Sequence, residues 1–286
     1  MRLAVAKERV RWIARRLARA ALGPAQFDEV ELISKLAAYS DGVMLDVGAN
    51  VGASLAWFAR RNWSVHAFEP DPETRDALLM HLPEHWHVRV DPRAVSAASG
   101  QVVPLYTSDV STGISSLAAF HASHKPTTTV LTVTLRDYMH EQGVESVDFL
   151  KVDAEGFDLF VLQGYPWEKT RPRLVLCEFE DRKTQALGYT YHDLGNLLAR
   201  QGYAVFMSEW HPVVEYGTRH RWLRLARWPT EVLDANAWGN LIAVPPTDQD
   251  RLVTLATRSA WRLRLRTTVE SVVRPWLERG SESPRV

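Results

Sequence analysis

Short apolar runs recur along the middle of the chain and predict the strands of a buried sheet. Each run is a few residues long and is followed by glycine, proline or a polar residue. Runs of this kind are typical of strands that are covered on both faces. We predict seven strands, at residues 43–47, 65–68, 88–90, 149–152, 174–179, 204–207 and 241–244.

Helical periodicity fills most of the segments between these runs. Strands that alternate with helices form βαβ units, which place the strands side by side in a parallel sheet. We therefore predict an α/β fold, Rossmann-like and doubly wound, with a mostly parallel seven-stranded sheet and helices on both of its faces. The expected helices cover residues 54–61, 74–81, 135–142, 157–163 and 191–201.

The segment between the third and fourth strands does not follow this alternation. Residues 101–106 and 130–134 are two additional predicted strands, and the loop between them covers residues 107–129. A loop of this length is usually functional or mobile. The sequence contains no internal repeat and no low-complexity tract.

Amphipathic helices are predicted at both ends of the chain, because apolar residues recur there at spacings of three and four. We divide the chain into an N-terminal helix (1–24), a central α/β domain (25–249) and a C-terminal helical tail (250–286). The apolar positions are Ala6, Val10, Ile13, Leu17 and Ala21 near the start, and Trp261, Leu265, Val269, Val272 and Trp276 near the end.

Charge is balanced over the whole chain but uneven along it. The formal net charge of the 286 residues is zero, which gives no case for nucleic acid as a partner. Residues 1–24 carry seven basic residues and one acidic residue, and residues 250–286 carry eight arginines and four acidic residues. Two interpretations of these basic helices stay open. One is peripheral contact with an anionic membrane surface, and the other is packing on the domain or on a second subunit of a homo-oligomer.

Cysteine use and the length of the apolar runs bear on the cellular compartment. Cys177 is the only cysteine, so no disulfide can form within the chain. Arg15 and Arg16 resemble a twin-arginine export signal, but Arg19 interrupts the apolar stretch behind them. No run reaches the roughly 18 apolar residues that a membrane span needs. We expect a cytoplasmic protein, with peripheral membrane contact as the alternative given above.

The first predicted strand runs into a glycine turn. Asp46 precedes the turn, and Gly48 and Gly52 bracket three other residues, so the pattern differs from the Gly-x-Gly-x-x-Gly that cradles a dinucleotide. Glycine at these positions lets a ligand approach the backbone closely. An acidic residue here would repel a pyrophosphate, whereas it suits the ammonium and sulfonium charges of S-adenosylmethionine.

The second predicted strand ends in Glu69. A carboxylate at this position can accept hydrogen bonds from both hydroxyls of a ribose, as in proteins that bind adenosine. The glycine turn and this acid together favour a nucleoside pocket at the carboxyl ends of the first two strands. From this region, the predicted donor-binding residues are Asp46, Gly48, Asn50, Gly52 and Glu69.

Four motifs in order resemble the FkbM family of methyltransferases. The resemblance runs from about residue 43 to residue 179 and implies S-adenosylmethionine as methyl donor. It also implies an oxygen acceptor, commonly a hydroxyl of a sugar, polysaccharide, lipid-linked glycan or polyketide. Family members usually carry Asp after the Thr-Leu pair, where this chain has Arg136. The motifs are Asp-Val-Gly-Ala-Asn-Val-Gly at 46–52, Phe-Glu-Pro at 68–70, Thr134-Leu135 with Tyr138, and Val-Asp-Phe-Leu-Lys-Val-Asp-Ala-Glu-Gly at 147–156.

Acidic residues follow the fourth predicted strand, at the edge that would hold the donor. Asp153 and Glu155 are the predicted catalytic carboxylates, because an alcohol acceptor needs a general base or a metal ion to take its proton. One of the two, which we assign to Asp153, also faces the donor, and the alternative for Glu155 is a helix cap. With Glu178 they would offer Mg²⁺ an oxygen-rich site. His211, or else His192, is a further candidate base.

The leading hypothesis is an S-adenosylmethionine-dependent O-methyltransferase that acts on a hydroxyl of a sugar, glycan or related natural product. The alternative is a non-catalytic protein that binds S-adenosylmethionine and recruits a partner or membrane through its basic helices. An NAD-dependent oxidoreductase is disfavoured by the missing middle glycine. Methylation of a flipped DNA base is disfavoured because no Asn-Pro-Pro-Tyr-like sequence follows the fourth strand.

Overall fold

The computed structural model describes residues 26–108, 115–213 and 220–279 of the chain. The predicted N-terminal helix at 1–24 lies outside these residues, as does the last part of the predicted C-terminal tail. The chain divides into two compact units. One spans Glu29–Gln249 and contains the sheets, and most of α9 (Gln249–Arg279) belongs to the other.

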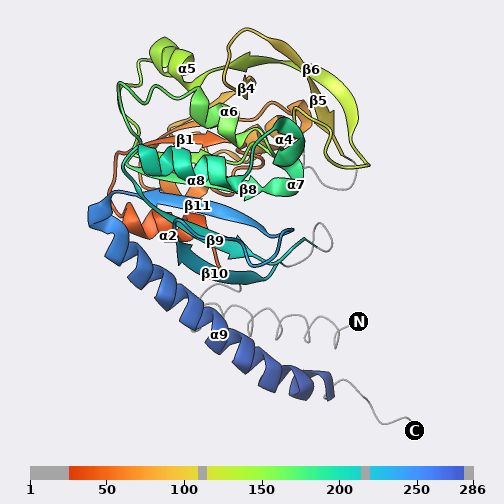
Figure 1. The fold of residues 1–286 in the computed structure, drawn as a ribbon, viewed down its shortest axis with the longest axis vertical. Coiled ribbons are helices and arrows are strands. Elements are labelled where there is room, and N and C mark those ends of the chain that lie inside the picture. Colours follow the sequence, from red (N-terminus) through yellow and green to blue (C-terminus); the bar gives the residue numbers. More distant parts are fainter. Residues whose placement is uncertain (1–25, 109–114, 214–219, 280–286) are drawn as a thin grey trace. The chain divides into compact units, whose positions relative to one another are not determined.

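An eight-stranded sheet forms the centre of the larger unit (Figure 1). Its strands are β1 (Val43–Val47), β2 (Ser64–Phe68), β3 (Val88–Asp91), β7 (Phe149–Val152), β8 (Leu174–Glu180), β9 (Ala204–Trp210), β10 (Trp222–Arg227) and β11 (Trp238–Val244). They lie in the order β10-β9-β11-β8-β7-β1-β2-β3. The five strands from β8 to β3 are parallel, and β11 is antiparallel to both of its neighbours. The strand order reverses between β1 and β7, where doubly wound sheets bind their ligands.

The predicted seven-stranded sheet is wrong by one strand. All seven predicted strands are present, and β10 is the eighth. This strand pairs only with β9, at the edge of the sheet, and a bulge lies between Trp222 and Arg224. None of its residues is fully buried, and arginines interrupt its sequence. An edge strand of this kind carries no continuous apolar run, so the criterion that found the other seven could not detect it.

Helices cover both faces of the sheet, as predicted. On one face α2 (Glu29–Leu36) contacts β8 and α3 (Ala56–Ala59) contacts β2. On the other face α6 (Asp158–Gln163) packs on β7 and β8, and α8 (Tyr191–Arg200) packs on β8, β9 and β11. Two further helices, α4 (Pro72–His81) and α5 (Leu135–Gln142), follow β2 and β6 (Lys125–Val133) along the chain. Each begins at a side-chain cap, because Asp71 accepts from the Glu73 amide and Thr134 from the Asp137 amide.

A second sheet of three strands, in the order β4-β6-β5, is formed by the insertion between β3 and β7. It consists of β4 (Ala94–Val95), β5 (Val102–Thr107) and β6. The two additional predicted strands are confirmed as β5 and β6, but β6 begins at Lys125, inside the predicted loop 107–129. The start of β6, Lys-Pro-Thr-Thr-Thr, is polar and exposed, so no pattern of apolar residues predicts a strand there.

The helix α9 carries seven of the eight arginines that were predicted for the C-terminal tail, and Arg285 lies outside the described residues. Arg251, Arg258, Arg262 and Arg264 lie along it, and the Trp261 side chain is 62% exposed. Within the described residues, no helix combines the length and the apolar character that crossing a bilayer requires. Membrane contact and self-association through the ends of the chain stay predictions.

Two charged residues interrupt the buried centre of the sheet. Asp46 on β1 is completely buried, and Lys151 on β7 is 8% exposed. They are register partners on neighbouring parallel strands. Because an isolated buried charge is very costly, the sequence requires these two side chains to pair, and this pair lies beneath the candidate site.

Candidate active site

A pocket lies at the carboxyl ends of β1, β2 and β7. Among the residues that line it are Gly48, Asn50, Glu69, Ser116, Asp153 and Glu155. The topological switch point between β1 and β7 is at the same position, so the pocket is where an open α/β sheet binds its ligand. Four of the six predicted donor-binding residues, Gly48, Asn50, Glu69 and Asp153, line it. The other two, Asp46 and Gly52, are not among its lining residues.

The glycine turn packs directly on the backbone that follows β7. Gly48 has φ +73°, and a Cβ on it would lie 1.9 Å from the Asp153 carbonyl oxygen. The amides of Gly48 and Ala49 both donate to the Phe68 carbonyl, at 3.1 and 3.0 Å. Only glycine fits at this position, because any side chain would collide with the Asp153 backbone that follows β7. The turn is therefore a backbone surface fixed by the two strands beside β1.

Glu69 is held by the same turn. Its carboxylate accepts from the Asn50 amide at 2.8 Å and from the Asp71 amide at 3.0 Å, one on each oxygen. The side chain is 6% exposed, and this burial raises the pKa of Glu69 to about 7. Each carboxylate oxygen keeps a second lone pair. Glu69 therefore presents a fixed acceptor to the pocket.

Asp46 lies behind the turn. Its Oδ2 accepts from the Ser54 hydroxyl at 2.9 Å, and its Oδ1 lies 3.4 Å from the Lys151 ammonium. Among the described residues, this Oδ1 has no hydrogen-bond partner. The same ammonium lies 3.2 Å from Asp153 Oδ2 and donates to the Gly48 carbonyl at 3.1 Å. Lys151 therefore ties Asp46, the glycine turn and Asp153 together.

Burial and the neighbouring charges act in opposite directions on the pKa values of this pair. Burial raises the pKa of Asp46, and the attraction of Lys151 opposes that rise. Burial lowers the pKa of Lys151, but the attraction of Asp153 and Asp46 outweighs it and the pKa ends above its ordinary value. Sequence reasoning missed Lys151, although a lysine between Leu150 and Val152 in an otherwise apolar strand is a signal of a buried partner.

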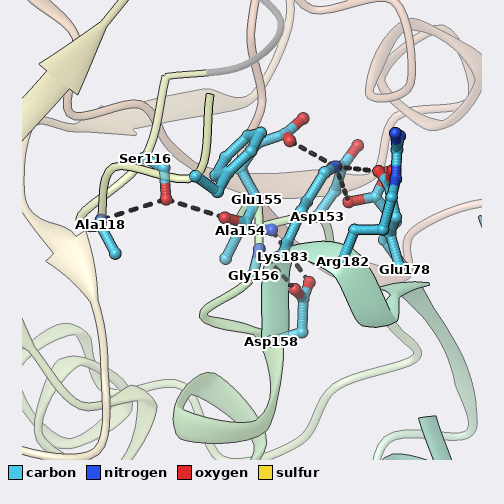
Figure 2. Close-up of polar contacts among 12 residues, drawn as sticks. Ser116, Ala118, Asp153, Ala154, Glu155, Gly156, Asp158, Glu178, Arg182 and Lys183 are labelled. Atoms are coloured by element: carbon cyan, nitrogen blue, oxygen red, sulfur yellow. Dashed lines mark hydrogen bonds and ion pairs between the residues drawn. The ribbon is translucent and has the colours of Figure 1, made fainter. Parts of the chain in front are cut away.

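Glu155 also lines the pocket, in a turn after β7 that is held from several directions (Figure 2). Its backbone is left-handed, with φ +49°, and Gly156 follows with φ +97°. The Asp158 carboxylate accepts from the amides of Ala154 and Gly156, and the Ser116 hydroxyl donates to the Glu155 carbonyl at 2.8 Å. A non-glycine residue in this conformation is strained, which is common at functional sites. The alternative role of Glu155 as a helix cap is not found, because α6 begins without any side-chain cap.

A buried lysine reaches the Glu155 side chain from α7 (Asp181–Thr184). The Lys183 ammonium lies 2.6 Å from Glu155 Oε2, 3.0 Å from Glu178 Oε2 and 3.1 Å from Glu180 Oε2 (Figure 2). Burial raises the pKa of Glu155 and of Glu178, and Lys183 opposes both rises. Burial lowers the pKa of Lys183, but the three carboxylates outweigh it, so the ammonium stays charged.

The predicted Mg²⁺ ligands do converge. Asp153, Glu155 and Glu178 each offer a carboxylate oxygen, and these oxygens lie within 4.8 Å of one another. However, Lys183 is bonded to two of the three carboxylates, and Lys151 is bonded to the third. Each predicted ligand therefore already has an ammonium partner.

The histidines are placed elsewhere. His211 follows β9, and its backbone amide and carbonyl bond to the Arg221 carbonyl and the Trp238 indole. His192 is paired with Glu231 at 3.3 Å. Neither is among the lining residues of the pocket. Arg136, which departs from the family pattern, pairs with Glu168 at the exposed surface and does not line the pocket either.

Part of the chain is similar in sequence to a curated methyltransferase. The chain is 31% identical over 137 residues to hexuronic acid methyltransferase AglP of Haloferax volcanii. The matched residues make up 44% of this chain and 51% of that protein. The chain therefore spans about half the length of this curated relative.

Similar solved structures include precorrin-6y C5,15-methyltransferase of Geobacter metallireducens, with 12% identity, a TM-score of 0.40 and coverage of 74% of this chain and 85% of that chain. A TehB-like S-adenosylmethionine-dependent methyltransferase of Corynebacterium glutamicum has 11% identity, a TM-score of 0.38 and coverage of 85% and 99%. A family model described as the methyltransferase FkbM domain matches residues 46–205. Since this match runs from the glycine turn to β9 and covers more than half of the chain, the protein belongs to the FkbM family of methyltransferases.

Proposed function

We propose that this chain is an S-adenosylmethionine-dependent methyltransferase that methylates a hydroxyl of a sugar, glycan or related natural product. The observation that carries the proposal is the pocket at the switch point. It combines the glycine turn, Glu69, Asp153 and Glu155 in one cavity. A donor site and a proton acceptor thus share one cavity in a chain of the FkbM family.

The residues on the donor side fit S-adenosylmethionine. Glu69 has lone pairs left for the ribose hydroxyls, and the Gly48 turn, packed against the backbone after β7, presents a fixed backbone surface to the donor. Asn50 and Asp153 line the same wall. Asp46 supports the turn from behind, through the Ser54 hydroxyl and through the Lys151 ammonium that also donates to the Gly48 carbonyl. We assign to Asp46 and Gly52 the role of supporting the glycine turn.

The chemistry requires a base on the acceptor side. The bound donor supplies a methyl group on a sulfonium, whose S–CH₃ bond breaks with its electron pair left on sulfur while the O–CH₃ bond forms. We assign the acceptor's proton to Glu155. Its Oε2 is held by Lys183, whereas its Oε1 has no hydrogen-bond partner in the part of the chain that the structure describes. Asp153, 37% exposed at its side chain, is the second carboxylate within the pocket and orients the acceptor.

Two predicted elements of the chemistry are not part of the proposal. His211 is bonded through its backbone away from the lining residues, so the proton is assigned to Glu155. Mg²⁺ is not required, because the carboxylates that would bind it are paired with lysines. The choice of a sugar hydroxyl is supported by the family and by the name of the relative in Haloferax volcanii, which acts on a hexuronic acid.

A calorimetric titration followed by an acceptor screen tests the proposal. S-adenosylmethionine is expected to bind, and NAD is not. With bound donor, S-adenosylhomocysteine is expected to form with at least one member of a panel of neutral, amino and uronic glycosides, and mass spectrometry should find one added methyl on an oxygen. Donor binding without S-adenosylhomocysteine from any acceptor would favour the non-catalytic alternative. Binding of NAD in place of S-adenosylmethionine would overturn the assignment.

A further inference from the structure

Lys183 is the centre of a compact group of charges beside the pocket. Its side chain is 5% exposed, and its ammonium is within 3.1 Å of three carboxylates, from Glu155, Glu178 and Glu180. These carboxylates come from two places in the fold, the turn after β7 and the end of β8. Lys183 itself belongs to α7, which follows β8 directly (Figure 2). One ammonium therefore joins the turn that carries Glu155 to the neighbouring strand.

A cation is needed at this point. Carboxylates as close as Glu155 and Glu178 cannot both ionise in a buried site unless a positive charge compensates them. Clusters of carboxylate oxygens of this size are the ligands that divalent cations use in proteins. In this chain a side chain supplies the charge, and all three ammonium protons have carboxylate partners.

The geometry leaves one oxygen of Glu155 for the acceptor. Lys183 binds Oε2, and Oε1 has no hydrogen-bond partner among the described residues. The backbone of the turn is fixed separately, by Asp158 below it and by Ser116 across it. The side chain of Glu155 thus depends on Lys183 for its direction, whereas its backbone does not.

We propose that Lys183 is the built-in cation of this site, a positioning residue that occupies the place of a divalent metal ion and holds Glu155 with its free oxygen toward the acceptor. The proposal rests on the proposed function for the role of Glu155. It has two consequences that can be measured separately. Turnover needs no divalent ion, and removal of the Lys183 charge opens a metal site among the carboxylates.

A metal-binding titration tests whether Lys183 takes the place of a metal ion, and it needs no acceptor. The free Mn²⁺ signal in electron paramagnetic resonance is recorded during titration of the wild type, of Lys183→Met and of Lys35→Met. Lys35 is the matched control, since it forms a partly exposed ion pair with Glu31 on α2. We expect that Lys183→Met binds one Mn²⁺ at least about tenfold more tightly than the wild type and the control. Equal Mn²⁺ binding by all three proteins would overturn the proposal that Lys183 takes the place of a metal ion.

Turnover tests the positioning role. Lys183→Met is expected to lower kcat about 100-fold, with the dissociation constant of S-adenosylmethionine changed less than twofold. Lys183→Met also leaves buried carboxylates without a partner, so it is expected to lower the melting temperature. The double variant Lys183→Met with Glu178→Gln removes that excess charge. We expect it to recover the melting temperature while kcat stays low, because Glu155 is still not held.

The outcomes separate the possibilities. Recovery of both kcat and melting temperature in the double variant would make Lys183 purely structural and would overturn the proposal. Loss of wild-type turnover in EDTA, restored by Mg²⁺, would do the same. A wild type that forms no S-adenosylhomocysteine from any acceptor would count against the proposed function, while the Mn²⁺ titration would still decide whether Lys183 replaces a metal ion.

Discussion

The two sides of the pocket are built in different ways. On the donor side the contact surface is backbone: the Gly48 turn packs on the exit of β7, and amides of the same turn fix Glu69. On the acceptor side the contacts are made by side chains from three segments, which meet at Lys183. Both sides contain a buried lysine that bridges carboxylates. From this difference we expect the donor side to be intolerant of substitution, and we expect that the acceptor side can be altered without loss of donor binding.

The largest effect is expected from a change in the donor-side backbone. Gly48→Ala would place a Cβ 1.9 Å from the Asp153 carbonyl oxygen at a positive φ, so we expect more than about 3 kcal/mol of lost unfolding free energy and no measurable donor binding. Gly143→Ala is the control. It has φ +65° with no atom within 4 Å, and should cost only about 1 kcal/mol. Chemical denaturation measures both, and equal losses would contradict a rigid turn.

The next effect separates chemistry from donor binding. Glu155→Gln removes the assigned base, so kcat is expected to fall about 10²- to 10⁴-fold. Steady-state kinetics on the acceptor found by the screen measure this fall. The dissociation constant of S-adenosylmethionine, from calorimetry, should stay within about twofold, because Glu155 is held by Lys183, whereas Glu69 is held by the amides of Asn50 and Asp71. Wild-type turnover by the folded variant would remove Glu155 from the chemistry.

A smaller effect is expected at the donor's ribose. Glu69→Ala should weaken binding of S-adenosylmethionine by about 1–3 kcal/mol through lost charge-assisted hydrogen bonds. Glu73→Ala, on the exposed first turn of α4, is the matched control and should leave the affinity unchanged. Calorimetry compares the two variants. If Glu69→Ala bound the donor as the wild type does, the ribose assignment would be wrong.

The smallest effect is a pH dependence of donor binding. Burial raises the pKa of Glu69 to about 7, with Asp71 adding to the rise and two backbone amides and Lys151 opposing it. The ionised form accepts the ribose hydroxyls, so affinity should increase as pH rises through that value, by about tenfold between pH 6 and pH 8. Glu69→Ala should show no such step. A wild-type affinity that falls with pH over this range would contradict the assignment.

The sequence predicted the parts of the fold that depend on continuous burial. Most of the seven predicted strands are buried along their length; β3, at one edge of the sheet, is only partly buried but still carries Val88 and Val90, and all seven were found. The edge strand β10, with Arg224 and Arg227, and the polar start of β6 were not, because neither is under a continuous apolar layer. A continuous run of apolar residues therefore indicates burial, and it does not detect elements at the margin of a sheet that lack such a run.

The same distinction holds for the site. Gly48, Asn50 and Glu69 were predicted because their role is local to one turn and one strand end, and they line the pocket. Lys151 carried a local signal, a charge inside an apolar strand, that was not used. Lys183 carried none, since its partners Glu155 and Glu178 belong to other segments and only the folded chain brings them together. The predicted Mg²⁺ alternative arose because the carboxylates were identified without their lysines.

Calorimetric titration of S-adenosylmethionine into Lys183→Met and Glu69→Ala, side by side with the wild type, tests the separation of the two sides most directly. The separation predicts that Lys183→Met binds the donor within about twofold of the wild type while Glu69→Ala binds it about 5- to 150-fold more weakly. Equal weakening in both folded variants would contradict it.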